Sequence, residues 1–323
     1  MTTNTPLLAV DDLCVEIPTR RGVLKPVDHV SLEIAAGEIL GVVGESGAGK
    51  SMTGNAVIGL LDPPAHISGG EVRLNGQRID DLPRDQMRKV RGKDIGMVFQ
   101  DPLTSLNPLL PIGDQLTETI LEHLPVSPSE ARSRAIAALD EVGIPAAASR
   151  IDSYPHEFSG GMRQRVVIAL ALCAEPALVI ADEPTTALDV SVQAQIISLL
   201  KRLCRERGTG VMLVTHDMGV IAEASDRVAV MYAGRLAEIG PVRQVLTQPQ
   251  HPYTAGLMGS TPGASLGRKR LNQIPGTMPG LSAVPEGCAY NPRCPRAEAK
   301  CRDAPPPPMS GNATCWFPGE VKI

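Results

Sequence analysis

The chain has 323 residues and a net charge of −4; 43% of its residues are hydrophobic but only 2% are aromatic. This length predicts one large domain plus a smaller one, with an aliphatic core of the kind that α/β proteins build. The net negative charge gives no sign of a nucleic-acid-binding surface, which requires an excess of basic residues. The longest apolar stretch, residues 166–181, is broken by Glu175-Pro176 and is shorter than a membrane span of about 20 residues. Residues 1–6 carry no signal-peptide pattern, so we expect a cytosolic protein without a membrane span.

Alternation of apolar and polar residues over positions 7–36 predicts short antiparallel strands. A fully apolar stretch at residues 39–43 predicts a buried strand, and residues 52–61 are compatible with a helix. Residues 70–79 predict two more strands joined at Asn75-Gly76, a dipeptide typical of tight hairpins. Residues 95–99 predict another buried strand.

A glycine-rich segment lies between the strand expected at 39–43 and the helix that follows it. Its sequence is Gly44-Glu45-Ser46-Gly47-Ala48-Gly49-Lys50-Ser51, followed by Met52. The segment fits the pattern G-x-x-x-x-G-K-[ST], and its strand and helix context argues against a chance glycine-rich turn. The glycines allow backbone N–H groups to face phosphate oxygens at a helix N-terminus. Lys50 suits the β- and γ-phosphates and the Ser51 hydroxyl suits Mg²⁺, so the sequence predicts binding of a nucleoside triphosphate.

Residues 102–174 follow a mainly helical pattern, which predicts a helical subdomain. The α/β pattern then returns, with strands expected at 178–181, 211–215, 227–232 and 235–239 and helices expected at 190–207 and 218–224. After residue 248 the composition shifts to Pro, Gly and Cys. We therefore predict a nucleotide-binding domain over residues 1–245 and a smaller domain over residues 246–323.

Two acidic residues, Asp182 and Glu183, follow the apolar stretch 177–181. A buried parallel strand brings its last side chains to the carboxyl edge of the sheet, where α/β proteins bind ligands. Asp182 suits the magnesium shell, and Glu183 suits polarising or deprotonating the attacking water. Alone, such a pair more often begins a solvated loop; its place downstream of a phosphate loop favours a functional site.

Ser159-Gly160-Gly161 precedes a helix expected at residues 162–172 and offers a second set of N–H groups at a helix N-terminus. The alternative is an ordinary serine N-cap. Two anion sites in one chain are explained if two chains enclose each nucleotide, one contributing Lys50 and the other Ser159.

The phosphate loop and a set of later residues together resemble an ATPase subunit of the ABC type over nearly the whole chain. In chain order these residues are Gln100, Ser159-Gly160-Gly161, Asp182-Glu183, Ala187-Leu188-Asp189 and His216. The resemblance implies an α/β core with a small antiparallel sheet, a helical subdomain, and a head-to-tail dimer of ATPase subunits. It also implies that Gln100 contacts the metal or the water and couples to a membrane partner. Asp189 would then lie at the dimer interface, and His216 would contact the γ-phosphate.

The family usually stacks adenine on an aromatic residue of the first strands, and Ile17 stands at that position here. Loss of a stacked ring predicts weaker contact with the base, with phosphate binding unaffected.

Residues 101–108, 154–158 and 250–254 resemble the oligopeptide/dipeptide importer branch of the family, and most of all its "D" ATPase subunit. That branch pairs two different ATPase subunits with two permeases and an extracytoplasmic solute-binding protein. The resemblance implies ATP-driven peptide import at the cytoplasmic face of the inner membrane, with ATP and Mg²⁺ bound. Nickel, glutathione or another solute is the alternative cargo within the branch. His251-Pro252-Tyr253 is expected to be a structural turn that does no chemistry.

Four of the seven cysteines lie in the last 36 residues with the spacing C-x5-C-x6-C-x13-C: Cys288, Cys294, Cys301 and Cys315. Disulfides are disfavoured in the cytosol, and the spacing is loose for a zinc site. Four thiolates in a proline-rich tail of low hydrophobicity fit an iron–sulfur cluster, and the branch resemblance implies a [4Fe-4S] centre. Zn²⁺ and unligated thiols are the alternatives. We expect Cys14, Cys173 and Cys204 to be core residues.

Two other classes of function are disfavoured. A soluble ABC-type ATPase acting on DNA or ribosomes normally has two cassettes or long charged insertions, and this chain has neither. A regulatory subunit without hydrolysis would not need Lys50, Asp182, Glu183 and His216 together.

Overall fold

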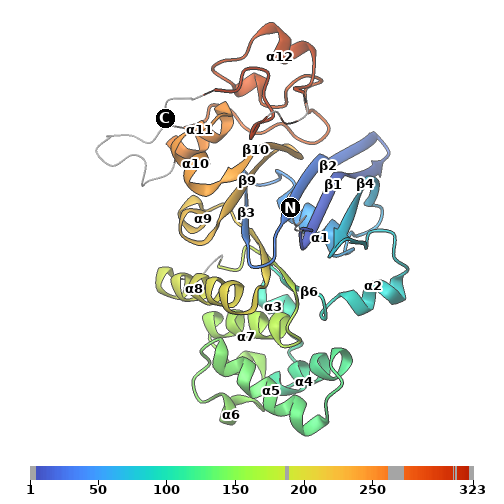
Figure 1. Cartoon of the computed structure of the whole chain (residues 1–323), viewed down its shortest axis with the longest axis vertical. Coiled ribbons are helices and arrows are strands. Elements are labelled where there is room, and N and C mark those ends of the chain that lie inside the picture. Colours follow the sequence, from blue (N-terminus) through green and yellow to red (C-terminus); the bar gives the residue numbers. More distant parts are fainter. Residues whose placement is uncertain (1–4, 186–188, 261–272, 308, 310, 320–323) are drawn as a thin grey trace. The chain divides into compact units, whose positions relative to one another are not determined.

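The computed structural model describes residues 5–185, 189–260, 273–307, 309 and 311–319. The chain forms two compact units, each with its own strands and helices (Figure 1). The first unit comprises residues 1–33, 39–80 and 214–323, and the second comprises residues 34–38 and 81–213.

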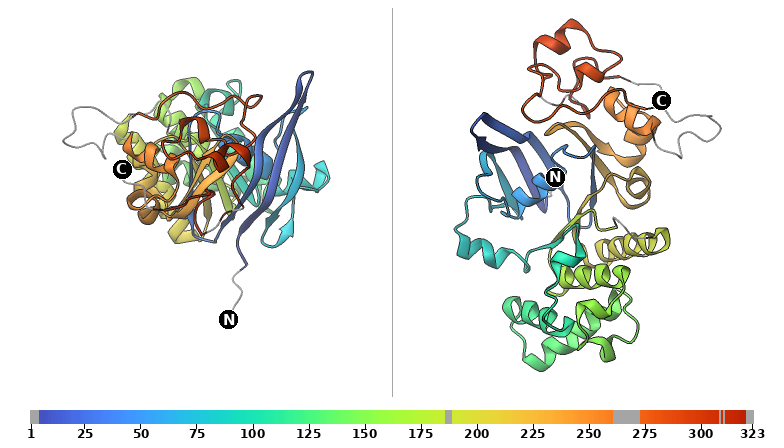
Figure 2. Two further views of the ribbon diagram at one scale, coloured as in Figure 1. Left: turned by 90° about the horizontal axis from the view of Figure 1, so that it is seen from above. Right: turned by 180° about the vertical axis from the view of Figure 1, so that it is seen from behind.

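A four-stranded sheet of the first unit has the strand order β2-β1-β4-β5. Its strands are β1 (Leu8–Thr19), β2 (Gly22–Ile34), β4 (His66–Leu74) and β5 (Gln77–Arg78). The hairpin at Asn75-Gly76 is confirmed: both residues have positive φ, and Leu74 pairs with Gln77. The strands of residues 7–36 are longer than expected, as the hairpin of β1 and β2 in Figure 2 shows. Register shifts after Asp11 and Cys14 interrupt the alternation inside β1, so one bulged strand has the sequence pattern of two short ones.

The first unit also contains β3 (Ile39–Val43), β9 (Arg227–Tyr232) and β10 (Arg235–Pro241), in the order β10-β9-β3. β3 pairs parallel with β9, and β9 pairs antiparallel with β10. The described helices of this unit are α1 (Lys50–Val57), α9 (Met218–Ala224), α10 (Val242–Thr247), α11 (Pro252–Gly259) and α12 (Ala299–Asp303). Residue 245, the predicted domain boundary, lies inside α10. The boundary itself stays a prediction.

The expected bounds of the helix at 52–61 were wrong at both ends. α1 begins at Lys50 because Gly49, the last glycine of the phosphate loop, is its N-cap. It ends at Val57 because Gly59 adopts a positive φ of 66°, the left-handed conformation that stops helices.

The second unit contains β6 (Ile95–Val98), β7 (Leu178–Asp182) and most of β8 (Gly210–Val214), in the order β8-β7-β6. Its described helices are α2 (Arg84–Val90), α3 (Pro102–Ser105), α4 (Ile112–His123), α5 (Pro128–Glu141), α6 (Ala147–Arg150), α7 (Gly160–Leu172) and α8 (Val190–Arg207). The pairing of β6 with β7 is parallel, and every residue of β7 is buried.

Helices α3 to α7 occupy residues 102–172, as the helical pattern of that stretch predicted. α4, α5 and α7 contact one another, and α7 also contacts β6, which places this group of helices against the strands of the same unit (Figure 1). The second half of α7, residues 166–172, is apolar, and all of it except Leu170 is buried. Ser127 caps α5 by accepting a hydrogen bond from the Glu130 N–H at 3.3 Å.

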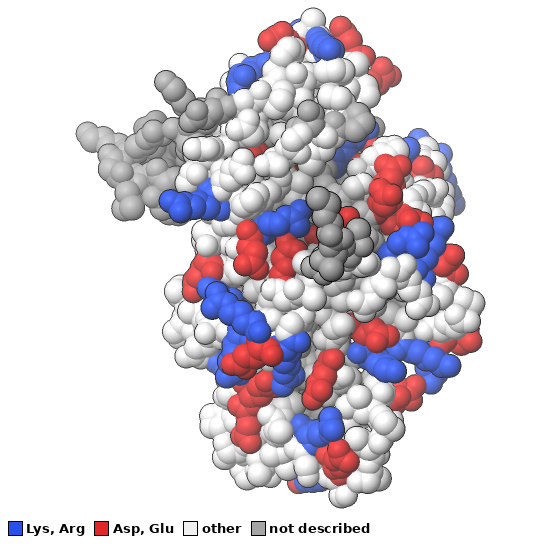
Figure 3. Space-filling model, in the orientation of Figure 1, with Lys and Arg blue, Asp and Glu red and all other residues white. Residues whose placement is uncertain are grey.

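Charged side chains of both signs are interspersed over the face drawn in Figure 3, without a large area of one sign. Within the part of the chain that the structure describes, no helix has both the length and the apolarity required to cross a bilayer.

The close packing of β6 against α7 can be tested at Gly96. A Cβ atom on Gly96 would overlap the Ala171 carbonyl oxygen and lie 3.1 Å from the Pro176 ring. Gly96→Ala should therefore lower the free energy of unfolding by about 1–3 kcal/mol, as overpacking does. Gly280→Ala is the matched control, because no atom lies within 4 Å of the added carbon. Chemical denaturation of both variants measures the difference, and equal stabilities would contradict the packing described.

Candidate nucleotide site

The phosphate loop connects β3 to α1 through glycines in the left-handed region. Gly44, Gly47 and Gly49 have φ values of 154°, 81° and 103°. A Cβ atom on Gly44 would overlap the Met231 carbonyl oxygen, and one on Gly49 would overlap that of Pro26. The backbone of the loop therefore passes so close to other backbone that only glycine fits at these two positions.

Lys50 is the first residue of α1 and is only 6% exposed. Its ammonium group donates to the carbonyl oxygens of Gly44 at 2.9 Å and Glu45 at 3.1 Å, so the charge lies within the turn of the loop. The Ala48 N–H also donates to the Glu45 carbonyl, at 3.1 Å. Ser51 follows with an exposed side chain, and Met52 is half-buried. This turn joined to a helix N-terminus has the geometry that binds phosphate groups.

His216 lies at the same carboxyl edge of the first unit as the phosphate loop. The Thr215 N–H donates to the carbonyl of Val42, near the end of β3, at 3.1 Å. His216 is the next residue and is exposed. Asp217 then caps α9, because its carboxylate accepts from the Gly219 N–H at 2.7 Å. The turn after β8 therefore brings His216 to the edge at which the phosphate loop begins.

In the second unit, the carboxyl ends of two adjacent parallel strands bring Gln100 and Glu183 together. Val98 of β6 pairs with Ala181 of β7, so the residues just beyond these positions share one edge. The Gln100 side-chain amide donates to a carboxylate oxygen of Glu183 at 3.0 Å. Glu183 adopts a positive φ of 47°, a strained conformation for a residue other than glycine that is common at functional sites. Asp182, the last residue of β7, is 7% exposed.

Two further predicted residues lie at helix N-termini of the second unit. Ser159 is the N-cap of α7, accepting from the Met162 N–H at 3.4 Å, and Gly160 and Gly161 form the first turn. Asp189 caps α8, accepting from the Val192 N–H at 2.9 Å and from the Ser191 hydroxyl at 2.6 Å. The Ser191 hydrogen bond is the main cause of the lowered pKa of Asp189. Ala187 and Leu188, part of the same predicted motif, lie outside the described residues.

Ile17 lies half-buried on β1. The first aromatic residue of the chain is Phe99, so the first strands offer no ring for the base. Weaker contact with adenine stays a prediction.

The segment His251-Pro252-Tyr253 forms the N-terminus of α11, as the expected structural turn. The His251 imidazole accepts from the Tyr253 N–H at 3.0 Å, and Glu238 accepts from the His251 N–H at 3.0 Å. Sequence reasoning missed a second role, because the fully buried Tyr253 hydroxyl accepts from the Glu45 N–H at 3.0 Å. Tyr253 therefore contacts the phosphate loop directly. The signal in the sequence that could have indicated this contact is that Tyr253 is one of the few aromatic residues of the chain.

The four tail cysteines line one pocket of the first unit, together with Tyr290, Trp316 and Phe317. Burial raises the pKa of the Cys288 thiol to about 11, with further contributions from the other three cysteines. The three remaining cysteines are buried core residues, as expected. Among the described residues, no three of the four tail cysteines have sulfur atoms within 4.8 Å of one another.

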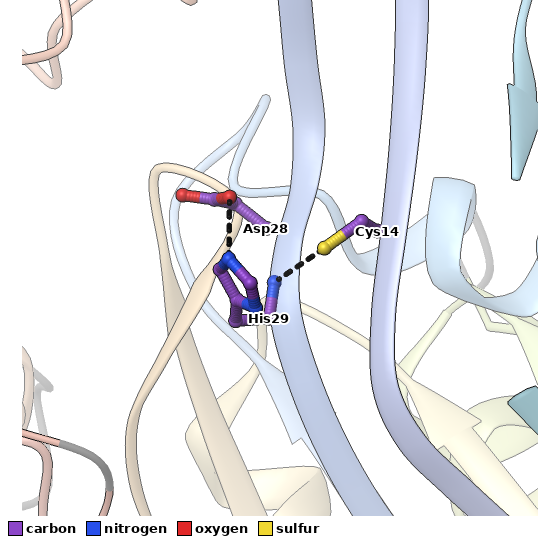
Figure 4. A group of neighbouring side chains, drawn as sticks. All are labelled: Cys14, Asp28 and His29. Atoms are coloured by element: carbon purple, nitrogen blue, oxygen red, sulfur yellow. Dashed lines mark hydrogen bonds and ion pairs between the residues drawn. The ribbon is translucent and has the colours of Figure 1, made fainter. Parts of the chain in front are cut away.

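A group with the residue types of a metal site, Cys14, Asp28 and His29, lies between β1 and β2 (Figure 4). The His29 N–H donates to the Cys14 sulfur at 3.4 Å. Asp28 forms an ion pair with Arg235 at 2.6 Å, and the His29 imidazole forms a hydrogen bond with the Asp12 carboxylate at 2.7 Å. These bonds account for the arrangement as part of the packing of the sheet.

The sequence matches two family models. Residues 27–186 match the model described as ABC transporter, and residues 237–301 match the oligopeptide/dipeptide transporter, C-terminal region. The dipeptide transport ATP-binding protein DppD of Bacillus subtilis is 46% identical over 316 residues, covering 96% of this chain and 94% of the relative. The oligopeptide transport ATP-binding protein OppD of Salmonella typhimurium is 48% identical over 300 residues, covering 93% and 89%.

Solved structures with the same fold include a dimeric ATP-binding cassette in a post-hydrolysis state with ADP and Pi. It superposes with a TM-score of 0.67 at 30% identity, covering 73% of this chain and 99% of the cassette. The fold and the phosphate loop thus define an ATPase of the ABC class, with ATP hydrolysis as its activity. Together with the relatives of near-equal length, they show that the chain belongs to the oligopeptide/dipeptide transporter family of ATP-binding proteins.

The turn before α11 leads to a prediction about pH. Burial lowers the pKa of His251 to about 4. The unfolded chain binds a proton there below about pH 6.5 that the folded chain excludes, so stability falls as the pH drops from about 6.5 toward 4. In His251→Asn the new side chain can still cap α11 but does not titrate. Wild type should lose about 2 kcal/mol more unfolding free energy than this variant between pH 7 and pH 5.

Urea unfolding at the two pH values measures this loss. His66→Asn, at an exposed position on β4, is the control and should keep the wild-type pH dependence. A wild-type pH dependence in His251→Asn would show that His251 does not control acid stability.

Proposed function

We propose that this ATPase powers the import of di- or oligopeptides through a membrane transporter. The proposal is supported by the relatives named as dipeptide and oligopeptide transport proteins, which match nearly the whole chain. Residues 237–301 also match the family model for the C-terminal region of oligopeptide/dipeptide transporters. In this role the chain binds two permeases at the cytoplasmic face of the inner membrane, beside a second, paralogous ATPase subunit. An extracytoplasmic solute-binding protein delivers the peptide.

The observation that carries the proposed hydrolysis mechanism is the hydrogen bond between Gln100 and Glu183 at the ends of β6 and β7. It holds the Glu183 carboxylate in one orientation, as a group that polarises the attacking water must be held. Because the Gln100 amide nitrogen is the donor, its oxygen is the atom that suits a cation.

The remaining proposed roles follow from residue chemistry. Asp182, Ser51 and Gln100 supply oxygen ligands for Mg²⁺, which neutralises charge on the phosphates when bound. Lys50 and the loop N–H groups bind the β- and γ-phosphates, and His216 contacts the γ-phosphate.

Two ATPase chains enclosing each nucleotide would explain the exposed N-terminus of α7. Ser159 and Gly160 are exposed, and a Cβ atom on Gly160 would meet nothing within 4 Å. The described part of this chain therefore does not require glycine there. An incoming phosphate group that approaches the backbone closely would require it. Asp189, also exposed at a helix N-terminus, is proposed to lie at the interface between the two ATPase subunits.

Glu183→Gln should bind ATP normally but hydrolyse it at least about 100-fold more slowly, because it lacks the base. Together with the paralogous ATPase subunit, the variant should accumulate as an ATP-bound dimer in size-exclusion chromatography, and the transporter carrying it should not take up peptides. Glu175→Gln, at an exposed position before the other end of β7, is the control and should keep wild-type turnover. Wild-type turnover by Glu183→Gln would mean that the base is elsewhere.

We further propose that Cys288, Cys294, Cys301 and Cys315 hold a [4Fe-4S] cluster. All four side chains line one pocket, as is required of residues that bind a single metal centre. A tetrahedral zinc ion would draw the sulfurs to about 3.8 Å from one another. A [4Fe-4S] cluster would use the same four thiolates, each bound to a different iron. When bound, the cluster would cross-link a segment with little hydrophobic core of its own.

Anaerobically purified protein should be brown and contain about four irons per chain. Cys301→Ser should lose the iron and make the tail more susceptible to proteolysis, because its metal cross-link is gone. Cys204→Ser, in the buried face of α8, is the matched control and should retain the iron. Stoichiometric zinc without iron would replace the cluster by a four-cysteine zinc site, and an ordered tail without either metal would refute both.

A further inference from the structure

Arg293 is a buried arginine of the C-terminal region, defined here as residues 273–319 of the described chain. It ends a short 3₁₀ turn, Asn291–Arg293, and is only 8% exposed. Its guanidinium donates to both carboxylate oxygens of Glu45 in the phosphate loop, at 2.8 and 3.1 Å. The two residues are 248 positions apart in the sequence but lie in the same compact unit.

The rest of the guanidinium is also bonded. The Nη1 nitrogen that bonds to Glu45 also donates to the Tyr232 hydroxyl at 3.2 Å, while Nε donates to the carbonyl oxygen of Pro275 at 2.8 Å and Nη2 to that of Gly276 at 3.4 Å. A planar group with this many partners has one orientation, whereas a lysine ammonium could not bond to all of them. Arg293 therefore connects the phosphate loop to the end of β9 and to the C-terminal region.

Glu45 is held at its backbone as well as at its side chain. Its N–H donates to the buried Tyr253 hydroxyl at 3.0 Å. The ring of Tyr253 packs against those of Tyr232 and Tyr290, with centroids 4.6 and 5.4 Å apart. Three of the four tyrosines of the chain thus form one rigid cluster behind this residue.

The position of Glu45 determines the shape of the phosphate site. Its carbonyl oxygen accepts from the Lys50 ammonium at 3.1 Å and from the Ala48 N–H at 3.1 Å. A rotation of the Glu45 peptide would therefore displace both the main cation of the loop and one of its N–H groups. The C-terminal region approaches the loop a second time, because a Cβ atom on Gly47 would lie 3.3 Å from the Met278 methyl carbon.

We propose that Arg293 is a positioning residue for the phosphate loop, and that the C-terminal region sets the affinity for ATP through the Arg293–Glu45 ion pair. The inference rests on the proposed binding of ATP phosphates by the loop. Arg293 touches no reacting atom in this scheme. It acts through Glu45 and holds the loop in its binding conformation before the nucleotide arrives. The loop then loses little conformational entropy when ATP binds, which strengthens binding.

The test is a double-mutant cycle on the full-length chain, with Arg293→Gln, Glu45→Gln and the double variant. Calorimetric titration with MgATP should give a dissociation constant raised about tenfold in each single variant. The double variant should bind MgATP no more weakly than either single variant, because both changes break the same ion pair. The dissociation constant of Arg293→Lys should lie between those of wild type and Arg293→Gln, because lysine keeps the positive charge but lacks the planar guanidinium group.

Two further measurements separate positioning from general damage. Steady-state kinetics should show a raised KM for ATP with kcat nearly unchanged, because Gln100 and Glu183 are left intact. Hydrogen exchange should be faster at the amides of residues 44–51 in Arg293→Gln, while the melting temperature of Glu45→Gln stays near that of wild type. Arg302→Gln, at an exposed position on α12, is the matched control for the loss of an arginine.

Unchanged MgATP affinity and loop exchange in a folded Glu45→Gln variant would overturn the proposal, and so would additive effects in the double variant. Lys50→Ala distinguishes this failure from a failure of the phosphate-loop assignment. If Lys50→Ala binds MgATP like wild type, the assignment itself is wrong. If Lys50→Ala abolishes binding while Arg293→Gln and Glu45→Gln do not weaken it, only the role of Arg293 is refuted.

Discussion

The close approach of one backbone segment to another at the phosphate loop is the constraint on which much of the first unit depends. Gly44 lies against the Met231 carbonyl and Gly49 against that of Pro26, with no room for a side chain. The Gly234 N–H donates to the Ala48 carbonyl at 3.0 Å, which binds the loop to the turn between β9 and β10. The loop is therefore not a free segment that closes around phosphate but part of the packed core. Anything that moves the end of β9 moves the loop as well.

The parallel strands explain why residues far apart in the sequence lie at the same edge. β6 and β7 end together in the second unit, so Gln100 and Glu183 meet although 83 positions separate them. In the first unit, the hydrogen bond from Thr215 to β3 places His216 at the edge where the phosphate loop starts. Each polar residue needs only to follow its own buried strand. The sheet then determines which residues are neighbours.

The sequence predicted those features that depend on short-range pattern. The phosphate loop, the Asn75-Gly76 hairpin and the apolar strand before Asp182 each carry their signal within about ten residues. The ends of the helices and strands were less predictable. A glycine of the loop caps α1, and a bulge in β1 interrupts the apolar alternation so that one long strand has the pattern of two short ones. The predicted roles of the site residues await the variants described above.

The contacts of Glu45 could not be predicted at all. Its partners Tyr253 and Arg293 are 208 and 248 positions away, in segments whose local patterns indicate only a turn and a proline-rich tail. Nothing in the periodicity of either segment indicates which surface it covers. Such contacts are specified by tertiary packing, which a single sequence does not display.

The single tryptophan, Trp316, occupies a place that gives the chain a built-in optical probe. Its indole N–H donates to the Ala304 carbonyl at 3.2 Å, the Lys300 ammonium lies 3.7 Å from the ring centre, and the ring lines the pocket of the four tail cysteines. Because the chain has one tryptophan, all of its indole fluorescence arises there. A coloured metal centre in that pocket would quench this emission by energy transfer. The fluorescence of the unlabelled protein therefore reports on the tail alone, without overlap from any second indole.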